Sequence, residues 1–567
     1  MLLLLLLLAG GDAAPSVPPP PLASASGSGR SSVRTGELRA PSTTTTGGGR
    51  AAWLTRFHMA LNSGPPHHHR WYQQDINGPI TINGTHHVFV LGHDLAGGRG
   101  WIHATSSDMV HWLNHGLTIN ANTGSITRAP SGDYVALYPF NGGIGWSTAA
   151  DSAAGLLLQN WTAPIAAISA VACGWGCRDA ARPFAIPGQR GLYMIAAGGV
   201  PKTGPAQATL FHSTDPKLQR WTRQPRPLFE TNVTAFGQVT DTFECPDVFP
   251  LSSSKWVFLA SLWQSSDPAW FGAPSQHSEE YVIGELDEGG VMQASHRAVL
   301  DHGYFYAAKT LAAENESNSG RRVLFGWLNP NVHQRPPYEL CPPDSNKGPY
   351  HSCWIGTQPE LLPRELTLVD DDDDDDGDDT ASILLRFAPI TELEALRSPL
   401  LSAGNRTLQC NGPAAVWPSV RGLQLDLIAT VTVPSVAAGE VGIEVLRSTG
   451  GEETTRIGLN VSAADGSVTG FVDRRQSSLA ASVANTSLMV APLRARQGEA
   501  VELRILLDGS VIEVFFNYTV AITSRSFPTR ADSVGTAAFF GGGCAQHATA
   551  RVQLTAFAMK PIVPLPS

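Results

Sequence analysis

The chain has 567 residues, enough for two or three domains at the usual size of about 100–200 residues each. Hydrophobic residues make up 42% of it and charged residues 16%, which excludes a highly charged disordered protein and a coiled coil. The net charge of −10 is local, because nine acids lie within residues 370–379 and without them 40 acidic residues face 39 basic ones. We therefore expect no binding of nucleic acid, and the lack of an interior run of 18 apolar residues predicts no membrane span.

The first residues have the composition of a leader. Met1 is followed by seven leucines and then by small residues, which is typical of a secretory signal peptide. The basic segment that usually precedes the apolar core is missing, so a misassigned start and a plastid-type leader are the alternatives. Residues 15 to about 50 are mainly Pro, Ser, Thr and Gly, with too few apolar side chains for a core. We expect residues 1–52 to lie outside the fold.

Sites for N-glycosylation are a second indication of secretion. N-x-S/T sequons without a middle proline occur more often than the about three that chance would give at this composition. They begin at Asn83, Asn160, Asn232, Asn315, Asn405, Asn460, Asn485 and Asn517. The sequons and the leader predict entry into the secretory pathway, with the cell wall, the vacuole or the medium as destination.

Seven cysteines predict disulfide bonds with one thiol left over. Cys173 and Cys177 form one short-range candidate pair, Cys341 and Cys353 form another, and a bond between Cys410 and Cys544 would close most of the C-terminal region. No C-x-x-C pair is present, which argues against a zinc ribbon. The histidines at 67–69 have no carboxylate or cysteine spaced to complete a metal site, so we predict a solvated loop there and no metal.

The apolar segments beyond residue 53 are short and rich in β-formers. Gly, Pro, Asn and Asp punctuate them at close spacing, as in an all-β sandwich, barrel or propeller. The aspartates at 370–379 lie between two such segments, 363–368 and 383–387, and predict a solvated hairpin loop, with weak calcium binding as the alternative. A boundary is expected near residues 390–405, because the alternating strands beyond it suggest a separate sandwich.

Three carboxylates have flanks suited to a pocket. Asp75 precedes a strand in a turn, Asp179 follows an arginine that would favour its ionisation, and Glu244 lies in the run F-E-C-P-D-V-F-P. Apolar neighbours and nearby carboxylates would raise the pKa of such a glutamate, as an acid working near neutrality requires. Retaining glycoside hydrolysis needs such a pair, one carboxylate as nucleophile and one as acid/base. Each segment alone also fits ordinary turn chemistry.

Together, and in this order, the three segments resemble motifs of glycoside hydrolase family 32, the invertase and fructan hydrolase family. The run D-I-N-G-P at Asp75 is similar to the family's W-M-N-D-P-N-G, R-D-A at Arg178 is similar to R-D-P, and E-C-P-D at Glu244 matches fully. Further similarities are W-I-H-A-T-S-S-D at Trp101 and D-H-G-Y-F-Y-A at Asp301, and the resemblance extends from about residue 56 to 560.

The resemblance implies a five-bladed β-propeller over residues 53–395 with the site in its central funnel, followed by a β-sandwich over residues 396–567. The cysteine beside the acid is unpaired in the family motif, which implies that Cys245 is the free thiol. The family works without a cofactor, so none is expected. The implied substrate is sucrose or a fructo-oligosaccharide.

The resemblance also implies roles for the residues that match. Asp75 would attack the anomeric carbon of a β-fructofuranosyl unit, and Glu244 would protonate the leaving oxygen and later deprotonate water. Asp179 would hold fructose hydroxyls and stabilise the transition state, with Arg178 fixing its charge.

Five further positions are implied to touch the substrate. Trp101 would form a stacking wall, and Asp301 would help to accommodate the glucose side of sucrose. Tyr72 stands where the family usually has Trp, Gln74 replaces an Asn beside the nucleophile, and Thr123 lies in a segment that partly matches F-S-G-S. An aromatic replacement like Tyr72 also occurs in fructosyltransferases. The predicted function is thus a secreted retaining β-fructofuranosidase, with a fructosyltransferase or an inactive carbohydrate-binding protein as alternatives.

Overall fold

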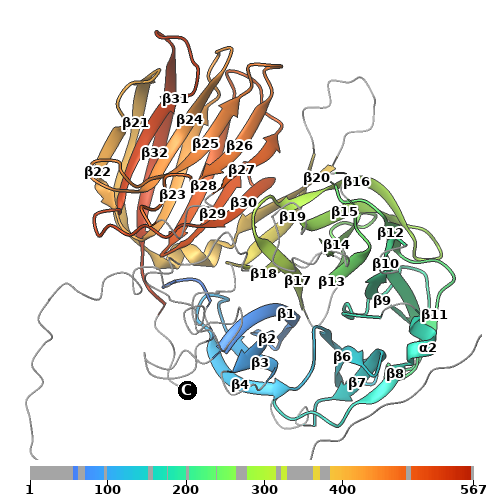
Figure 1. Cartoon of the computed structure of the whole chain (residues 1–567). Helices are drawn as coiled ribbons and strands as arrows, with labels where there is room; N and C mark the ends of the chain where they lie inside the picture. Colours follow the sequence, from blue (N-terminus) through green and yellow to red (C-terminus); the bar gives the residue numbers. More distant parts are fainter. Residues whose placement is uncertain are drawn as a thin grey trace, which may run out of the picture. The chain divides into compact units, whose positions relative to one another are not determined.

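The structure is a computed structural model that describes residues 55–59, 61, 71–94, 99–150, 158–174, 177–199, 204–235, 237, 239–263, 278–313, 321–328, 362–370, 383–480 and 487–562. Its strands form five four-stranded blades followed by two six-stranded sheets, and parallel pairing of one strand from the first blade with one from the fifth joins these two blades into an eight-stranded sheet (Figure 1). The predicted all-β architecture of a five-bladed propeller and a C-terminal sandwich is therefore confirmed. The leader and the Pro/Ser/Thr/Gly-rich segment predicted within residues 1–52 lie outside the described residues.

Residues 71–231 supply the first three blades. The first contains β1 (Trp71–Ile82), β2 (Thr85–Asp94), β3 (Arg99–Ser106) and β4 (Leu113–Ile119). The second contains β5 (Ser125–Arg128), β6 (Tyr134–Phe140), β7 (Gly143–Thr148) and β8 (Ile165–Ile168), and the short helix α2 (Ala170–Cys173) follows it. The third contains β9 (Leu192–Gly199), β10 (Ala206–Ser213), β11 (Thr222–Arg223) and β12 (Phe229–Thr231).

Residues 242–389 supply the last two blades. The fourth contains β13 (Thr242–Pro250), β14 (Trp256–Trp263), β15 (Ser278–Leu286) and β16 (Met292–Asp301). The fifth contains β17 (Phe305–Ala313), β18 (Arg322–Leu328), β19 (Arg364–Asp370) and β20 (Ile383–Pro389). Asp370 pairs with Ile383 across β19 and β20, so the two strands that flank the aspartate tract are antiparallel neighbours, as expected of a hairpin. Residues 371–379 themselves lie outside the described part.

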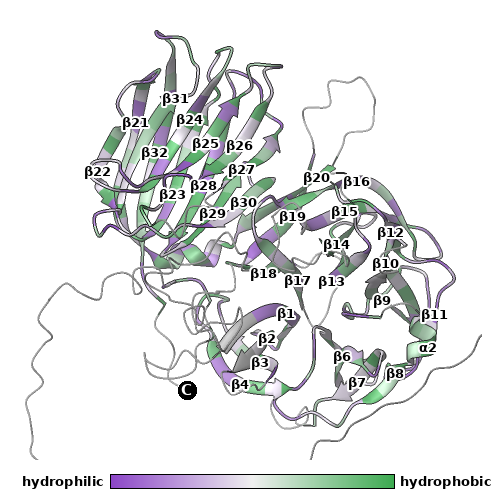
Figure 2. Cartoon of the chain, in the orientation of Figure 1, coloured by the Kyte–Doolittle hydropathy of each residue, from purple (hydrophilic) through white to green (hydrophobic). Residues whose placement is uncertain are grey.

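The strands of the blades are short apolar runs because many are covered on both faces. β18 is buried at every position, and β6 and β15 are buried over most of their length. A continuous apolar run of this length is typical of a fully buried strand, whereas a strand with one wet face alternates. Figure 2 shows hydrophobic stretches beside hydrophilic ones on the strands of the blades and of the sandwich.

The first strands of the blades meet at the centre of the ring. β1 contacts both β5 and β17, and β13 contacts both β9 and β17. Arg182 joins three blades there, because its guanidinium donates to the carbonyl oxygens of Pro79 at 2.5 Å, Thr310 at 3.0 Å and Ile126 at 3.4 Å. Hydrogen bonds to a charged donor are stronger than neutral ones, so Arg182 helps to hold the ring closed.

The sandwich follows the 3-10 helix η3 (Thr391–Leu396), and the domain boundary near residues 390–405 stays a prediction. One sheet has the order β21 (Arg397–Gln409), β32 (Thr549–Met559), β23 (Gln424–Thr432), β28 (Ala500–Asp508), β29 (Val511–Phe516) and β30 (Val520–Arg525). The other has the order β22 (Ala415–Arg421), β31 (Gly535–Gly541), β24 (Gly439–Arg447), β25 (Thr455–Val461), β26 (Val468–Asp473) and β27 (Leu488–Leu493).

A buried ionic cluster ties the segment before the first blade to the sandwich. Asp508 accepts the backbone N–H groups of Arg56, Phe57 and His58, and the His58 ring lies 2.9 Å from both Asp508 and Glu513. Burial lowers the pKa of His58, but the hydrogen bonds and charges of the two carboxylates outweigh burial and raise it to about 9. His58 is therefore a cation at neutral pH.

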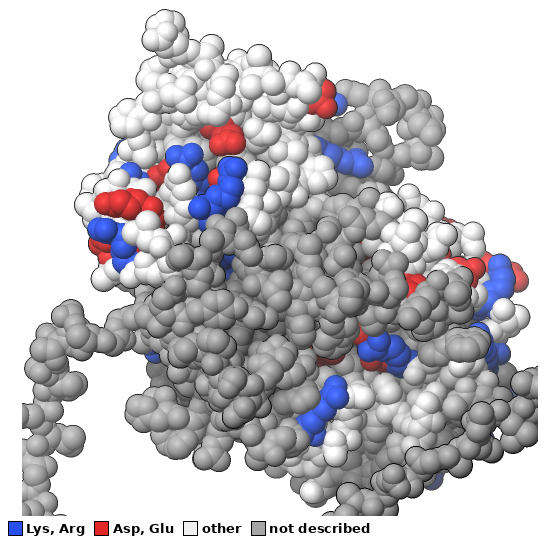
Figure 3. All heavy atoms as spheres, viewed as in Figure 1, with Lys and Arg blue, Asp and Glu red and all other residues white. Residues whose placement is uncertain are grey.

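The surface carries charges of both signs, and on the face shown in Figure 3 basic and acidic side chains lie near one another. The side chains of five sequon asparagines are exposed, namely Asn83, Asn160, Asn232, Asn405 and Asn517, and Asn460 is half-buried. Asn315 and Asn485 lie outside the described residues. Glycosylation stays a prediction. Within the described residues, no helix has the length and apolar character needed to cross a membrane.

We predict that His58→Gln lowers the free energy of unfolding by about 3–5 kcal/mol near neutral pH, because two buried carboxylates lose their cation. The pKa of His58 is higher in the folded state than its unfolded value of 6.5, so its contribution is complete below that value and is lost as pH rises through about 9. Chemical denaturation of the wild type and of His58→Gln, near pH 6 and near pH 10, measures the free energy of unfolding of each. The wild type should exceed the variant by less at the higher pH.

The matched control is His111→Gln. His111 also forms an ion pair, with Asp108, but its side chain is 38% exposed. His111→Gln should lower the free energy of unfolding by less than about 1 kcal/mol. A stability difference for His58→Gln that stays constant across this pH range would contradict the assignment of His58 as the buried cation.

Candidate active site

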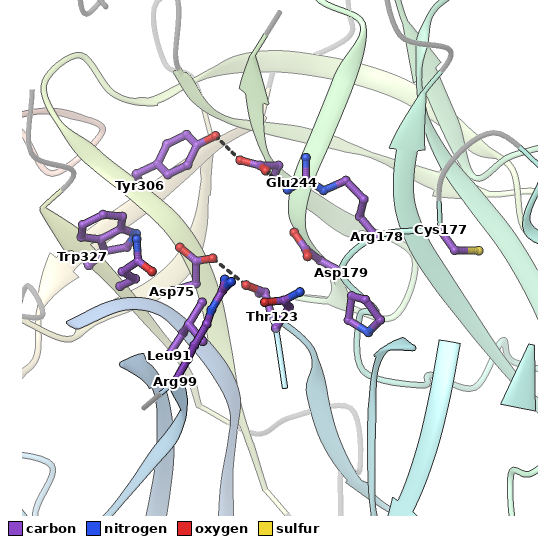
Figure 4. Close-up of a pocket in the computed structure, with 13 residues that line it drawn as sticks. Asp75, Leu91, Arg99, Thr123, Cys177, Arg178, Asp179, Glu244, Tyr306 and Trp327 are labelled. Atoms are coloured by element: carbon purple, nitrogen blue, oxygen red, sulfur yellow. Dashed lines mark hydrogen bonds and ion pairs between the residues drawn. The ribbon is translucent and has the colours of Figure 1, made fainter. Parts of the chain in front are cut away.

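A cavity of about 420 Å³ lies at the centre of the ring (Figure 4). Strands of the first, second, fourth and fifth blades and the segments that precede β5 and β9 contribute to its lining. The lining consists of Gln74, Asp75, Leu91, Arg99, Asn122, Thr123, Pro139, Cys177, Arg178, Asp179, Glu244, Tyr306 and Trp327. The three carboxylates singled out from the sequence thus share one pocket, although they are far apart along the chain. A volume in this range accommodates a small ligand.

Asp75 lies in an irregular part of β1. The pairing of β1 with β2 shifts register between Gln73 and Ile76, which leaves Gln74 and Asp75 in a bulge, and a bulge re-aims side chains. The Thr123 hydroxyl donates to Asp75 Oδ2 at 2.5 Å. Burial raises the pKa of Asp75 to about 6, and this rise is opposed by the Thr123 hydrogen bond, increased by Asp179 and opposed by Arg178 and Arg99.

Asn77 braces this bulge against the second blade. Its amide donates to the Asp75 carbonyl at 2.9 Å, and its Oδ1 accepts the Gly124 N–H at 2.7 Å. A Cβ atom on Gly124 would lie 2.2 Å from the Leu137 carbonyl oxygen, so the position requires glycine. The D-x-N spacing seen in the sequence therefore serves to hold the strand that carries Asp75 beside the segment that carries Thr123.

Asp179 is held between the third and fourth blades. The backbone on both sides of it pairs with β9, since Arg178 N donates to the Ala197 carbonyl and Ala197 N donates to the Asp179 carbonyl. Its carboxylate Oδ2 accepts the Cys245 N–H at 2.9 Å. An acid that precedes the third blade and pairs with its first strand thus contacts the residue that follows Glu244 in the fourth.

Glu244 lies in β13 just before a second bulge. The pairing of β13 with β14 shifts register between Glu244 and Asp247, and Cys245 has a left-handed φ of 48°. The Glu244 side chain is 12% exposed, and it accepts the Tyr306 hydroxyl at 2.9 Å. Burial raises the pKa of Glu244 to about 7, with opposition from Arg178 and Tyr306 and a further rise from Asp179 and Asp75.

Arg178 forms its ion pair with Glu244, with 2.5 Å between Nη2 and Oε1. The sequence placed this arginine beside Asp179, its neighbour in the chain, as the group that fixes the charge of Asp179. The structure adds a contact to that expectation. The charge of Asp179 does act on Arg178, but the guanidinium forms its ion pair with the glutamate. The sequence does not indicate this contact, since the two residues meet only when the third and fourth blades pack.

The structure places the other predicted substrate contacts differently. Gln74 and Thr123 line the cavity, as expected of residues that touch a ligand there. Tyr72 belongs to β1, but its side chain lies outside the described part of the structure. Trp101 is fully buried, and its Nε1 donates to the Asn122 carbonyl at 3.0 Å. Trp101 does not line the cavity, because its ring packs behind the segment that does, so the predicted stacking role is not supported by this arrangement.

Asp301 is also placed elsewhere. Its carboxylate is buried against Arg364 of the fifth blade at 3.0 Å and against the hydroxyl of Thr523 in the sandwich at 2.6 Å. Asp301 does not line the cavity, so the expected contact with the glucose side of a substrate is not supported. The motif around Asp301 identifies the segment but does not determine the direction in which the Asp301 side chain points.

Sequence reasoning missed several lining residues. Tyr306 was part of the quoted F-Y-A motif but received no role, and its hydroxyl now contacts Glu244. Arg99 lies on β3 two residues before the motif at Trp101 and outside that motif, and Trp327 lies on β18, where no motif was recognised. Among the described residues, no group of three or more His, Cys, Asp or Glu side chains is arranged to hold a metal ion.

The cysteines form two disulfides within the described residues, Cys173–Cys177 and Cys410–Cys544, both of which were candidate pairs. Cys245 is free and buried, as the resemblance implied. Cys341 and Cys353 lie outside the described residues. Burial raises the pKa of the Cys245 thiol well above its usual value.

Comparison with known proteins finds two family models along the chain. The model described as Glycosyl hydrolases family 32 N-terminal domain matches residues 67–376, and the model described as Glycosyl hydrolases family 32 C terminal matches residues 392–556. A beta-fructofuranosidase, insoluble isoenzyme CWINV5, of Arabidopsis thaliana is 25% identical over 566 residues, which cover 86% of this chain and 90% of that protein.

Solved structures share the fold. Fructan 1-exohydrolase IIa from Cichorium intybus has a TM-score of 0.69 and 20% identity, with 91% of this chain and 98% of that chain covered. A fructosyltransferase from A. japonicus has a TM-score of 0.70 and 19% identity, with 91% of this chain and 96% of that chain covered.

We predict that Cys245 resists alkylation in the folded protein, because it is buried and its thiol stays protonated. In denaturant without reductant, one cysteine per chain should become alkylated if Cys341 and Cys353 are joined as predicted. Intact-mass spectrometry counts the labels, and Cys245→Ser should carry none. Three labels on the denatured wild type would show that Cys341 and Cys353 are not bonded to each other.

Proposed function

The chain belongs to glycosyl hydrolase family 32, and from this membership we propose that it is a retaining hydrolase that releases fructose from β-fructofuranosides such as sucrose or short fructans. The observation that carries the proposal is the convergence of Asp75 and Glu244 in one pocket, each with a partner suited to a different role. The β-fructofuranosidases among the relatives support the substrate class.

Asp75 is the proposed nucleophile. Its carboxylate attacks the anomeric carbon of the fructosyl unit while Glu244 gives its proton to the leaving oxygen, so that the glycosidic bond breaks and a fructosyl ester forms. Water then attacks the anomeric carbon, Glu244 takes a proton from it, and free fructose leaves with Asp75 restored. Asp179 holds fructose hydroxyls and stabilises positive charge on the ring.

The surroundings of Glu244 suit a group that alternates between acid and base. Burial favours the protonated form that must donate in the first step. Arg178 and Tyr306 favour the ionised form that exists between the two steps. The balance between these effects gives a pKa of about 7, near which a general acid works efficiently at neutral pH.

Transfer of fructose to another sugar is the second candidate function. The observation that favours it is Tyr72, which stands where the family usually has Trp, as also happens in fructosyltransferases. In that case a sugar hydroxyl takes the place of water in the second step, and the roles of Asp75 and Glu244 are unchanged.

We also propose that the chain enters the secretory pathway, where disulfides form and persist. The predicted leader, the exposed sequon asparagines and the two disulfides support this location. The cell wall, the vacuole and the medium are the candidate destinations.

The proposal predicts equal amounts of glucose and fructose from sucrose, and fructose from inulin-type and levan-type oligosaccharides. Asp75→Asn and Glu244→Gln should each lower kcat by about 100-fold or more, because each removes a group that reacts. Chromatography of the released sugars over time measures the product ratio and the rate of each variant. Glu285→Gln is the matched control, since Glu285 is a 57% exposed carboxylate of the same blade, and it should leave the rate unchanged.

Product ratios decide between the candidate functions. Glucose in excess over fructose, together with longer oligosaccharides, would favour the transferase. Binding of fructosides without release of any sugar, in wild type and variants alike, would favour an inactive carbohydrate-binding protein.

The covalent step is tested separately with fructosyl fluoride, whose leaving group needs no protonation. Glu244→Gln treated with this donor should gain the mass of one fructosyl unit, because it forms the ester but hydrolyses it slowly. Asp75→Asn should gain none. The same mass gain in both variants would exclude Asp75 as the nucleophile.

The two carboxylates predict a bell-shaped pH dependence of kcat/KM. Asp75 must be ionised, so activity rises as pH rises through about 6, and Glu244 must be protonated, so activity falls as pH rises through about 7. Arg99→Gln should move the acid limb to higher pH, because Arg99 lowers the pKa of Asp75. Initial rates across the pH range measure both limbs. An acid limb that does not respond to Arg99→Gln would contradict its assignment to Asp75.

A further inference from the structure

A row of buried polar residues crosses the fourth blade outward from the pocket. Glu244 on β13 lies directly opposite Ser261 on β14, and Ser261 lies directly opposite Glu279 on β15. Residues directly opposite each other in neighbouring strands point to the same face of a sheet. Ser261 and Glu279 are fully buried. A buried carboxyl group costs stability unless its polar atoms find partners, so the contacts of Glu279 require an explanation.

Hydrogen bonds connect Glu279 to the strand that carries Tyr306. The Ser261 hydroxyl donates to Glu279 Oε2 at 2.6 Å and accepts the Ala307 N–H at 3.1 Å. Ala307 has a left-handed φ of 56° and lies where the pairing of β17 with β18 shifts register. A residue with a Cβ atom keeps this conformation only when its surroundings hold it there. Ser261 supplies such a contact.

The held residue follows Tyr306 directly in the chain. The Tyr306 hydroxyl donates to Glu244 Oε2 at 2.9 Å. Because Ala307 is the next residue in the chain, the conformation of its backbone affects the direction in which the Tyr306 side chain points. The contacts therefore run from Glu279 through Ser261 to Ala307, and from there through the backbone to Tyr306 and Glu244.

Glu279 is itself in an unusual state. Burial raises its pKa to about 8, although Ser261, the amides of Ala308 and Ala307, and Lys309 oppose the rise. Lys309 donates to the Pro246 carbonyl at 2.6 Å, and Asp301 lies opposite Glu279 on the outer strand β16. At the pH expected for catalysis Glu279 keeps its proton and adds no negative charge behind the pocket.

We propose that Glu279 is a positioning residue for the acid/base glutamate, which acts through Ser261 and Ala307 to aim the Tyr306 hydroxyl at Glu244. The inference rests on the proposed function only in naming Glu244 as the acid/base, and the arrangement of the four residues stands without it. Glu279 does not line the cavity, so it acts on the reaction through other groups.

The test compares Glu279→Leu, which removes the acceptor at similar volume, with Glu279→Gln, which keeps a neutral acceptor for Ser261. The measurement is the pH titration of the Glu244 carboxyl, followed by infrared difference spectra between each protein and the same protein with Glu244→Gln. The midpoint should move to higher pH in Glu279→Leu, as in Tyr306→Phe, because ionised Glu244 loses its hydrogen bond from Tyr306. Glu279→Gln should keep the wild-type midpoint.

Two further results are expected. The double variant Glu279→Leu/Tyr306→Phe should show no shift beyond that of Tyr306→Phe alone, because both changes remove the same contact. If the proposed hydrolysis takes place, kcat of Glu279→Leu should fall by on the order of 10- to 100-fold while Glu279→Gln recovers most of it.

An unchanged Glu244 midpoint in folded Glu279→Leu would overturn the proposal, as would shifts that add in the double variant. Should Glu279→Leu fail to fold, Ser261→Ala removes the same link with little change of volume, and an unchanged midpoint there would equally overturn it. A wild type that releases no fructose while the midpoint moves as expected would reject the proposed function and support the positioning role.

Discussion

The contact between Arg178 and Glu244 is the interaction on which the pocket depends. Glu244 shares a buried cavity with Asp75 and Asp179, and burial together with the two other acids drives it toward the neutral form. Arg178 is the nearby cation that makes an ionised Glu244 tolerable there, since a buried carboxylate without a partner is costly. The pair also joins a residue of the third blade to one of the fourth, so the chemistry of the glutamate depends on the packing of the ring.

Irregular strands deliver the pocket side chains. A regular strand alternates its side chains between the two faces of a blade, and those faces are covered by neighbouring blades. Register shifts interrupt the pairing at Asp75 in β1, after Glu244 in β13 and after Tyr306 in β17. Each shift lets one innermost strand aim a polar side chain toward the centre, which the uninterrupted ladder would not allow.

Not every motif residue serves the pocket. Asp301 lies in a motif that resembles one of the family, yet its carboxylate joins Arg364 of the fifth blade to Thr523 of the sandwich. Arg364 also pairs with Glu513, which contacts His58 before the first blade. These buried charges hold segments that are distant in sequence, so a matching motif can mark a structural junction as well as a site.

The sequence by itself determined the all-β class, because short apolar runs between turn residues are a local property, and the resemblance of its ordered motifs to those of the family implied the propeller followed by the sandwich. It also singled out Asp75, Asp179 and Glu244, whose motifs are contiguous, and the free Cys245. Only the tertiary structure decided that Arg178 pairs with Glu244, that Tyr306 and Arg99 face the cavity, and that Trp101 and Asp301 do not. These outcomes depend on where bulges direct side chains and on which blades pack together. Both are set by contacts between distant residues, which no single segment of the sequence records.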